Sequence, residues 1–309
     1  MIINILQFLA GALFLYYGAE FLIKGSKSVA EKYNISSVII GITLVALGTS
    51  LPELIVSIMA NIREEPGMAI GNVMGSNVAN IGLVLGTTTI LSPINFPFTK
   101  IRFNMYFLIG ITFLPLWFIF MDGLVFYQGM VLIVVLIIYC VYLIKNNQLD
   151  GKENNITVDG NNFLLIIQVI TGIIGLAVGA ILFVEGAKGI ALSLGVSSLV
   201  IGMSIVAFGT SLPELAASLS AAKHGETGMI IGNIIGSNIM NIVLVLGITI
   251  LIRNIPTEFA DIIIQGLFML ILTVGLFFLL KWQDRITKLP GVILTLIYIL
   301  FLFFNFQSI

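Results

Sequence analysis

Long apolar runs separated by short polar connections dominate the pattern of hydrophobic and polar positions in this 309-residue chain. A helix that crosses a membrane needs roughly 20 mostly apolar residues, and ten runs meet this requirement. The long polar stretch at 145–162 is rich in asparagine and charge and has no hydrophobic period, so we interpret it as a solvent-exposed linker. The predicted spans are 3–24, 36–61, 67–91, 103–121, 124–144, 163–187, 197–221, 227–252, 258–280 and 289–307.

Composition supports an all-α polytopic membrane protein. Only 9% of the residues are charged, against about 25% in a soluble domain. The net charge of -1 provides no basic surface for nucleic acid. One cysteine, Cys140, and one histidine, His224, exclude an ordinary zinc site and a disulfide framework. We expect a buried, inert thiol at Cys140, a solvated His224 in a short turn, and no removable signal peptide before the first span.

The two sides of the linker are copies of each other. Adding 161 to a residue number in the first half finds its counterpart in the second, and Ser36–Gly86 aligns with Ser197–Gly247 without a gap. Of these 51 positions, 30 are identical. We therefore divide the chain into a first five-helix repeat at 1–144, the linker at 145–162 and a second repeat at 163–309. Because five is odd, the second repeat enters the membrane from the opposite side, as in many secondary transporters.

Lysine and arginine predict the orientation, because they concentrate in cytoplasmic connections. One set of connections holds eleven of them, including the linker, and the opposite set holds three. We therefore expect a multi-pass protein of the cell membrane, with a cytoplasmic linker and both termini extracellular. The larger set is Lys24, Lys27, Lys32, Lys100, Arg102, Lys145, Lys152, Lys223, Lys281, Arg285 and Lys288, and the smaller is Arg63, Lys188 and Arg253.

The sequence Gly-Thr-Ser-Leu-Pro-Glu occurs twice within apolar runs, ending at Glu53 and at Glu214. An ionisable residue at membrane depth is costly and indicates a functional site. The prolines, Pro52 and Pro213, lack an N–H and clash with the carbonyl four residues earlier, so each helix must break or kink. Broken helices at this depth occur where their freed carbonyls line a cavity or bind an ion. The repeated carboxylates are therefore candidate ion ligands.

The groups around the two breaks form an oxygen-only set, from Ala46 to Ser50 and from Ala207 to Ser211, together with the two glutamates. Hard oxygen ligands favour Ca²⁺, Mg²⁺, Mn²⁺ or Na⁺ over softer metals. Two carboxylates balance one Ca²⁺, whose 6–8 oxygen ligands such a set can supply, whereas Mg²⁺ prefers to keep several waters. These residues favour Ca²⁺ over Mg²⁺.

A second repeated element follows each break, at 71–80 and at 232–241, and reads Gly-Asn-x-x-Gly-Ser-Asn-x-x-Asn. Glycines four residues apart let helix backbones approach closely. The serine and the last asparagine share one helix face, which could complete the ligand set. These face residues are Ser76, Asn80, Ser237 and Asn241, whereas Asn72, Asn77, Asn233 and Asn238 are interpreted as capping or packing groups. Glu20 and Glu185 have no counterparts, and structural and gating roles both stay open for them.

As a pair, these motifs resemble the two alpha-repeats of the cation/calcium exchanger superfamily, and they are most similar to its prokaryotic sodium/calcium exchangers. The resemblance covers nearly the whole chain. It implies Na⁺/Ca²⁺ antiport by alternating access, in which the first and sixth spans slide across the rest. It also implies a protein without a cofactor, with the bilayer, Ca²⁺ and Na⁺ as its partners, and a monomer is our working expectation.

The resemblance also assigns roles by motif. It implies that Glu53 and Glu214 bind Ca²⁺ with the backbone carbonyls of Thr49 and Thr210, and that Asn80 and Asn241 line the central site. Its implied Na⁺ ligands are the carbonyls of Ala46 and Ala207 and the side chains of Ser50, Ser76, Ser211 and Ser237.

Asn241 departs from the pattern of the best-studied archaeal members, which have aspartate there, and it removes a third titratable group. An alternative therefore stays open: the protein could be an antiporter that exchanges protons for Ca²⁺ or another divalent cation through the same glutamates. A channel would not need broken helices between inverted halves. An enzyme would need a base beside Ser50 or Ser211, and the only histidine lies in a loop.

Overall fold

The computed structural model describes residues 1–121, 123–150, 162–195, 207–257 and 259–307, and these are mostly helical. In the first half, Ser36 caps the short helix α2 by accepting a hydrogen bond from the Ile39 N–H. The elements there are α1 (Ile2–Tyr33), α2 (Ser37–Ile40), the π-helix η1 (Gly41–Val45), α3 (Ala46–Thr49), α4 (Leu51–Ile62), α5 (Pro66–Ala79), the π-helix η2 (Asn80–Leu85), α6 (Gly86–Leu91), β1 (Ile94–Asn95), the 3-10 helix η3 (Phe98–Lys100), α7 (Arg102–Met121) and α8 (Phe126–Asp150).

The second half repeats much of this order. Its π-helix begins at Asn241, which is 161 residues after the first residue of η2. The elements are α9 (Asn162–Ser193), α11 (Ala207–Gly209), α12 (Leu212–Lys223), α13 (Thr227–Met240), the π-helix η5 (Asn241–Leu246), α14 (Gly247–Ile252), α15 (Phe259–Trp282), β2 (Arg285–Ile286) and α16 (Lys288–Gln307).

Within the described residues, eight helices are long and apolar enough to cross a membrane. A ninth candidate span consists of two segments, Ser37–Thr49 and Leu51–Ile62, which meet at an angle of 43°. The predicted span at 197–221 lies partly outside the described residues. The chain is thus a helical, multi-pass membrane protein, and the count of ten spans stays a prediction.

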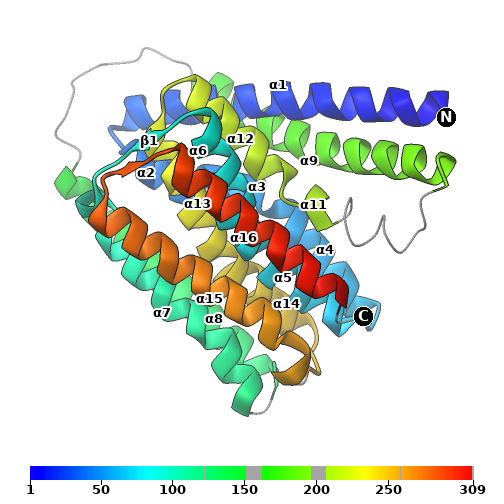
Figure 1. Ribbon diagram of the computed structural model, residues 1–309. Helices are drawn as coiled ribbons and strands as arrows, with labels where there is room; N and C mark the ends of the chain where they lie inside the picture. Colours follow the sequence, from blue (N-terminus) through cyan, green and yellow to red (C-terminus); the bar gives the residue numbers. More distant parts are fainter. Residues whose placement is uncertain (122, 151–161, 196–206, 258, 308–309) are drawn as a thin grey trace.

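Helices α1 and α9 lie side by side and antiparallel, and they project beyond one side of the bundle (Figure 1). Glycines bring the two backbones together. A Cβ added at Gly18 would lie 2.6 Å from the Leu176 nitrogen, and one added at Gly179 would lie 2.6 Å from the Leu15 nitrogen. Contacts this close between backbones leave no space for side chains, so α1 and α9 form one two-helix unit.

The remaining helices bury the centre of the molecule, where α5 with η2 and α6, and α13 with η5 and α14, carry the largest buried shares. α13 packs against η1, α5 against α4, and α15 and α16 cover the outside (Figure 1). Large apolar side chains on α7, α8, α9 and α16 remain exposed. In a membrane, these side chains contact lipid.

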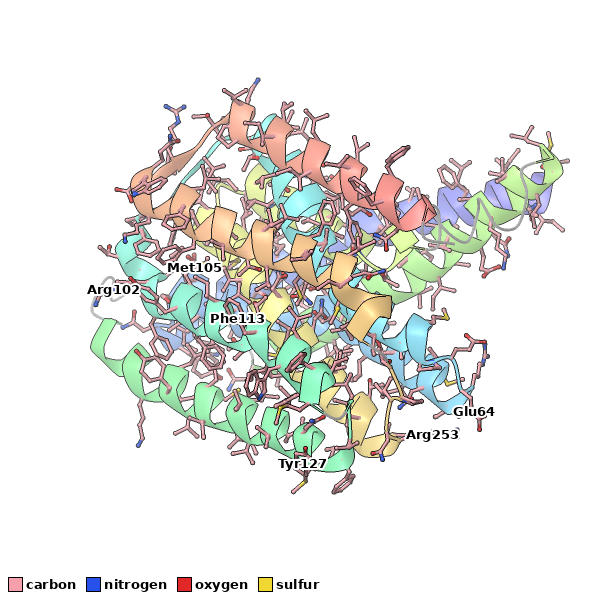
Figure 2. All side chains as sticks on the ribbon, turned by 60° about the horizontal axis from the view of Figure 1, so that its bottom comes forward. Glu64, Arg102, Met105, Phe113, Tyr127 and Arg253 are labelled. Atoms are coloured by element: carbon pink, nitrogen blue, oxygen red, sulfur yellow. The ribbon has the colours of Figure 1, made fainter. Side chains whose placement is uncertain are left out.

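The charged connections gather at two opposite ends of the bundle. At one end β1 pairs antiparallel with β2, with Asn95 opposite Arg285, and Arg102 begins α7 beside them. At the other end, Arg253 Nη2 lies 2.8 Å from Glu64 Oε1. Figure 2 shows Arg102 far from the Glu64–Arg253 pair. Arg102, from the larger predicted set of basic residues, and Arg253, from the smaller set, thus lie at opposite ends of the bundle.

Two expectations need correction, and a third region, the predicted linker, begins differently from its polar pattern. Helix α8 continues to Asp150, so the polar stretch expected as a linker from 145 begins within a helix, while 151–161 lies outside the described residues. Cys140 is only half-buried because it lies on a partly exposed face of α8. His224 is not simply solvated: its Nδ1 lies 2.8 Å from the Ser220 carbonyl oxygen and its Nε2 lies 3.6 Å from Glu20 Oε2.

Candidate functional site

The predicted helix break is present in the first half and has a matching backbone in the second. Ser50 separates α3 from α4 with φ -85° and ψ 4°, and Ser211 precedes α12 with φ -88° and ψ 3°. Pro52 and Pro213 occupy the first turns of the helices that follow. Proline is well tolerated in a first turn, where its missing N–H costs no hydrogen bond. Each motif therefore ends one helix and begins the next.

Each break places a glutamate in the first turn of the following helix. Glu53 in α4 and Glu214 in α12 are both fully buried, and Ser50, three residues before Glu53, contacts Glu214 Oε1 at 3.5 Å. The amide groups at a helix N-terminus favour a negative charge nearby. These amide groups cannot replace the water that two carboxylates lose on burial. The two carboxylates therefore require a bound cation or protons.

Several polar atoms around the glutamates have no hydrogen-bond partner among the described residues. Buried polar groups are almost always paired, so each exception needs an explanation. Many of these exceptions are at the residues that the motifs selected, where they supply mainly oxygen atoms, and others are on Ser26, Asn77, Thr88, Asn238, Gln265 and Thr273. At the selected residues, the unpaired atoms are both carboxylate oxygens of Glu53, Oε2 of Glu214, Oγ of Ser211, and the Oδ1 and Nδ2 atoms of Asn80 and Asn241.

Asn80 and Asn241 each begin a π-helical turn, η2 and η5. Short π-helical stretches inside α-helices frequently occur at functional sites. Both side chains are completely buried. The same irregularity therefore presents an amide group in each half, at positions related by the repeat. Sequence reasoning found these two asparagines but did not predict the π-helices.

Hydrogen bonds cross between the halves at the break. Ser50 Oγ donates to Glu214 Oε1 at 3.5 Å. Thr49 Oγ1 donates to Asn233 Oδ1 and also lies 3.3 Å from Ser237 Oγ. Residues that are more than 160 positions apart in the sequence thus line one buried polar region. The candidate site lies between the two repeats.

Asn72 and Asn233 serve as packing groups, as the sequence predicted. Asn72 Nδ2 donates to the Glu53 carbonyl at 3.0 Å and to Ser57 Oγ at 2.8 Å, which fixes α5 against α4. Asn233 Nδ2 donates to Ser218 Oγ at 3.2 Å, the equivalent contact in the second half. Asn233 also accepts the bond from Thr49, a contact across the halves that sequence reasoning missed. The available signal was its position four residues before Ser237, on the same helix face.

The glycines of the second motif admit a close helix crossing. A Cβ at Gly236 would lie 2.5 Å from the Ile42 carbonyl oxygen, and one at Gly232 would lie 2.5 Å from that of Val38. Helix α13 therefore crosses α2 and η1 at backbone contact. The equivalent positions in the first half, Gly71 and Gly75, have no described residue within 4 Å of an added Cβ. The segment of the second half that corresponds to α2 and η1 falls within 196–206, which lies outside the described residues.

The predicted site residues do not all have the same environment. Thr49, Ser50, Ser76 and Ser237 are buried, whereas Thr210 is half-buried. Ala46 is buried, and its carbonyl accepts hydrogen bonds from the Ser50 N–H at 3.0 Å and from Thr49 Oγ1 at 3.3 Å. Ala207 begins α11, and its side chain lies outside the described residues.

The chemistry of the region is that of a hard cation. Its donors are carboxylate, amide and hydroxyl oxygens, which suit Na⁺ or Ca²⁺. Among the described residues, no three side chains of histidine, cysteine, aspartate or glutamate gather in one place. A site with only two carboxylates must complete its coordination with neutral oxygens.

Comparison with known proteins identifies the family. The model of the family described as sodium/calcium exchanger protein matches residues 3–145 and 164–307. This chain belongs to that family. Family membership makes it a transport protein and not an enzyme, and the two matched segments lie on either side of the central polar stretch.

Similar proteins cover almost the full length of the chain. An uncharacterized membrane protein of Methanocaldococcus jannaschii is 40% identical over 304 residues, with 97% of each chain covered. The sodium/calcium exchanger MaX1 of Methanosarcina acetivorans is 30% identical over 341 residues, again with 97% of each covered. A solved structure of the sodium-calcium exchanger NCX_Mj matches with a TM-score of 0.84 and 39% identity, covering 97% of each chain.

Proposed function

We propose that this protein is a secondary active antiporter that exchanges Na⁺ for Ca²⁺ across the cell membrane. The observation that carries the proposal is the pair of fully buried glutamates, Glu53 and Glu214, at matching helix breaks in the two halves. Relatives such as MaX1 are described as sodium/calcium exchangers, and this supports the same pair of ions here.

The ligand roles follow from the chemistry of each group. Glu53 and Glu214 supply two negative charges and up to four oxygens, which suit one Ca²⁺. The carbonyls of Thr49 and Thr210 and the side chains of Asn80 and Asn241 add neutral oxygens. The proposed Na⁺ ligands are the carbonyls of Ala46 and Ala207 and the hydroxyls of Ser50, Ser76, Ser211 and Ser237. Because these sets overlap, Na⁺ and Ca²⁺ compete.

Transport then proceeds by alternating access. Competition between Na⁺ and Ca²⁺ is not enough for exchange. The site must also open to one face of the membrane at a time, so that a bound ion leaves on the side opposite its entry. In the proposed architecture, two inverted five-helix repeats at 1–144 and 163–309 enclose the site, and the unit of α1 and α9 moves across the rest. The linker is cytoplasmic, both termini are extracellular, and the protein works as a monomer in the bilayer.

Uptake of ⁴⁵Ca²⁺ into proteoliposomes tests the proposal. Vesicles loaded with Na⁺ are compared with vesicles loaded with K⁺ and with vesicles that have an outward proton gradient. We expect uptake that requires internal Na⁺. Uptake driven only by the proton gradient would overturn the sodium-coupled function and assign proton exchange to the same glutamates.

A further inference from the structure

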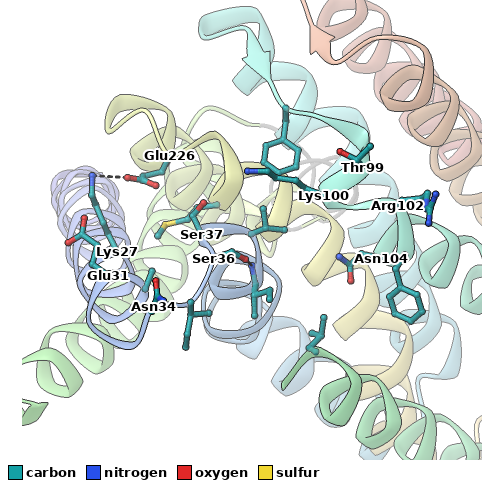
Figure 3. Close-up of a pocket in the computed structure, with 18 of the residues that line it drawn as sticks. Lys27, Glu31, Asn34, Ser36, Ser37, Thr99, Lys100, Arg102, Asn104 and Glu226 are labelled. Carbon is teal, nitrogen blue, oxygen red and sulfur yellow. Dashed lines mark hydrogen bonds and ion pairs between the residues drawn. The ribbon is translucent and has the colours of Figure 1, made fainter. Parts of the chain in front are cut away.

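An ion pair between α1 and the start of α13 helps to join the two-helix unit to the rest of the bundle, at the end that carries Lys100 and Arg102. Lys27 Nζ on α1 lies 2.7 Å from Glu226 Oε1, as Figure 3 shows. Glu226 is the N-cap residue of α13, but its side chain accepts no capping hydrogen bond. Its carboxylate is therefore available to the lysine on the neighbouring helix.

The inverted repeat contains a second copy of this pair. The counterpart of Lys27 is Lys188 on α9, and the counterpart of Glu226 is Glu65. Glu65 is likewise the N-cap residue of its helix, α5, and its side chain makes no capping hydrogen bond. All four charged residues are thus retained in matching places, although many neighbouring positions differ between the halves.

The two copies are in different states. The nearest carboxylate that pairs with Lys188 is Glu185 on its own helix, at 4.0 Å, and both side chains are about half exposed. Glu65 is exposed and makes no ion pair with any described residue. The ion pair is therefore formed in one half and separated in the other.

The packing of the helices shows the same difference. α1 packs along α12, whereas the corresponding helices of the other copy, α9 and α4, make at most marginal contact. In Figure 1, the C-terminal end of α9 projects past the bundle beside the N-terminus of α1. The two-helix unit is thus packed on α12 at the Lys27 end, whereas near the Lys188 end Val184 of α9 lies against Gly209 of α11 but α9 and α4 make at most marginal contact.

The geometry of the unit couples the two ends. Gly186 packs against Phe8 and Gly25 packs against Val169, so Lys188 lies level with the start of α1 and Lys27 with the start of α9. About 20 residues of helix, or about 30 Å, therefore separate the two lysines along the unit. This distance is close to the thickness of the hydrocarbon core of a bilayer. The lysines mark opposite membrane faces.

We propose that Lys27–Glu226 and Lys188–Glu65 are alternately formed gate ion pairs, one at each face of the membrane. Movement of the unit of α1 and α9 that brings Lys188 to Glu65 separates Lys27 from Glu226, because α1 and α9 are in backbone contact and move together. The inference rests on the proposed function, since it assigns the two facing states of the exchanger to the two ion pairs.

Additional contacts favour the state with the Lys27 end closed. Glu20 Oε1 accepts hydrogen bonds from Lys223 Nζ at 3.1 Å and from Ser220 Oγ at 3.2 Å, which join α1 to α12. The counterparts of Glu20 and Lys223 are Ile181 and Ile62, which cannot form this contact. Among the described residues, the Lys188 end shows no equivalent of the Glu20 contacts, so the two facing states are stabilised unequally.

Disulfide trapping tests the gate in the full-length protein. Cys140→Ala removes the only native thiol, and two double variants are then made, Lys27→Cys with Glu226→Cys and Lys188→Cys with Glu65→Cys. After mild oxidation in proteoliposomes, disulfides are scored by protection from maleimide-polyethylene glycol. We expect each pair to form a disulfide, each to slow ⁴⁵Ca²⁺ exchange at least tenfold, and a reductant to restore the rate.

The matched control combines Lys27→Cys with Glu65→Cys, which lie at opposite ends and should not cross-link. In the variant with all four cysteines, one disulfide should exclude the other in the same chain. Formation of both disulfides in one chain, or none between positions 188 and 65 during active exchange, would overturn the gate. Disulfide formation can be scored whichever ion drives transport. It therefore tests the gate even if the Cys140→Ala parent shows no Na⁺-driven uptake, a result that would contradict only the proposed function.

Charge exchange provides a second route if the cysteine variants do not fold. Lys188→Glu or Glu65→Lys alone should lower the exchange rate several-fold, and the double variant should restore most of it. Equilibrium Ca²⁺ binding should stay within about twofold, because neither residue belongs to the proposed ion site. Unchanged exchange in both single variants, or no recovery in the double variant, would contradict the inference.

Discussion

Ser50 Oγ, at the helix break of the first half, donates a hydrogen bond to Glu214 Oε1 in the second half at 3.5 Å. The repeat-related hydroxyl of Ser211 has no partner among the described residues, and neither does either carboxylate oxygen of Glu53. The two halves therefore surround the same buried carboxylates with unequal contacts. An exchanger needs groups here that change partners as ions arrive and leave.

Replacing either buried glutamate by its neutral isostere should abolish exchange without unfolding the protein. Glu53→Gln or Glu214→Gln removes a charge that binds Ca²⁺ but keeps the volume, and it relieves the burial of a charged group. We expect ⁴⁵Ca²⁺ exchange to fall at least a hundredfold, with the melting temperature unchanged or raised. Glu64→Gln is the control, because Glu64 pairs with Arg253 at an exposed position. Normal exchange by either buried-site variant would refute the site.

Asn241→Asp should alter the ion preference or pH dependence of transport more than it alters folding. It adds a third carboxylate to the proposed site, and neighbouring like charges favour the binding of a proton, so a proton competes with the cation. Exchange should then gain a dependence on pH, with lower rates on the acidic side. Uptake measured from pH 5 to pH 9 checks this. A pH profile identical to that of the wild type would show that Asn241 only joins helices.

Asn72→Ala should destabilise the protein and weaken Ca²⁺ binding together. It removes the amide group that holds the Glu53 carbonyl and Ser57 Oγ, at a cost of about 1–3 kcal/mol. Asn77→Ala is the matched control on the same helix, because Asn77 Nδ2 donates only to the Val73 carbonyl, four residues earlier. Thermal unfolding and Ca²⁺ titration would measure both effects. Equal Ca²⁺ affinities in the two variants would exclude a positioning role for Asn72.

Gly236→Ala should be strongly destabilising. Its Cβ would lie 2.5 Å from the Ile42 carbonyl oxygen and 2.6 Å from the Ile42 Cα, and backbone atoms cannot move aside as a flexible side chain can. We expect a loss of at least about 2 kcal/mol, in the range of overpacked cores. Gly110→Ala on α7 is the control, since no described residue lies within 4 Å of its added Cβ. Equal melting temperatures for the two variants would contradict the close crossing of α13 and η1.

The hydrophobic pattern predicted most of the helices because membrane helices satisfy their backbone hydrogen bonds locally and need only sufficient apolar length. Local chemistry also placed the break at Pro52, where a missing N–H and a steric clash act within four residues. The pattern predicted the apolar part of α8 but not its continuation as a helix to Asp150. Polar residues are compatible with a helix once it leaves the membrane, and the absence of a hydrophobic period did not reveal this continuation.

The sequence by itself determined the membrane class, the internal repeat, and the glutamates Glu53 and Glu214 as the candidate site. Only the tertiary structure decided that Thr49 meets Asn233 and that Lys27, not its counterpart Lys188, forms the cross-helix ion pair. Identical repeats predict equivalent contacts, whereas a protein in one conformation holds its two halves in different environments. Such contacts depend on how the halves pack together, and no local pattern of residues encodes that choice.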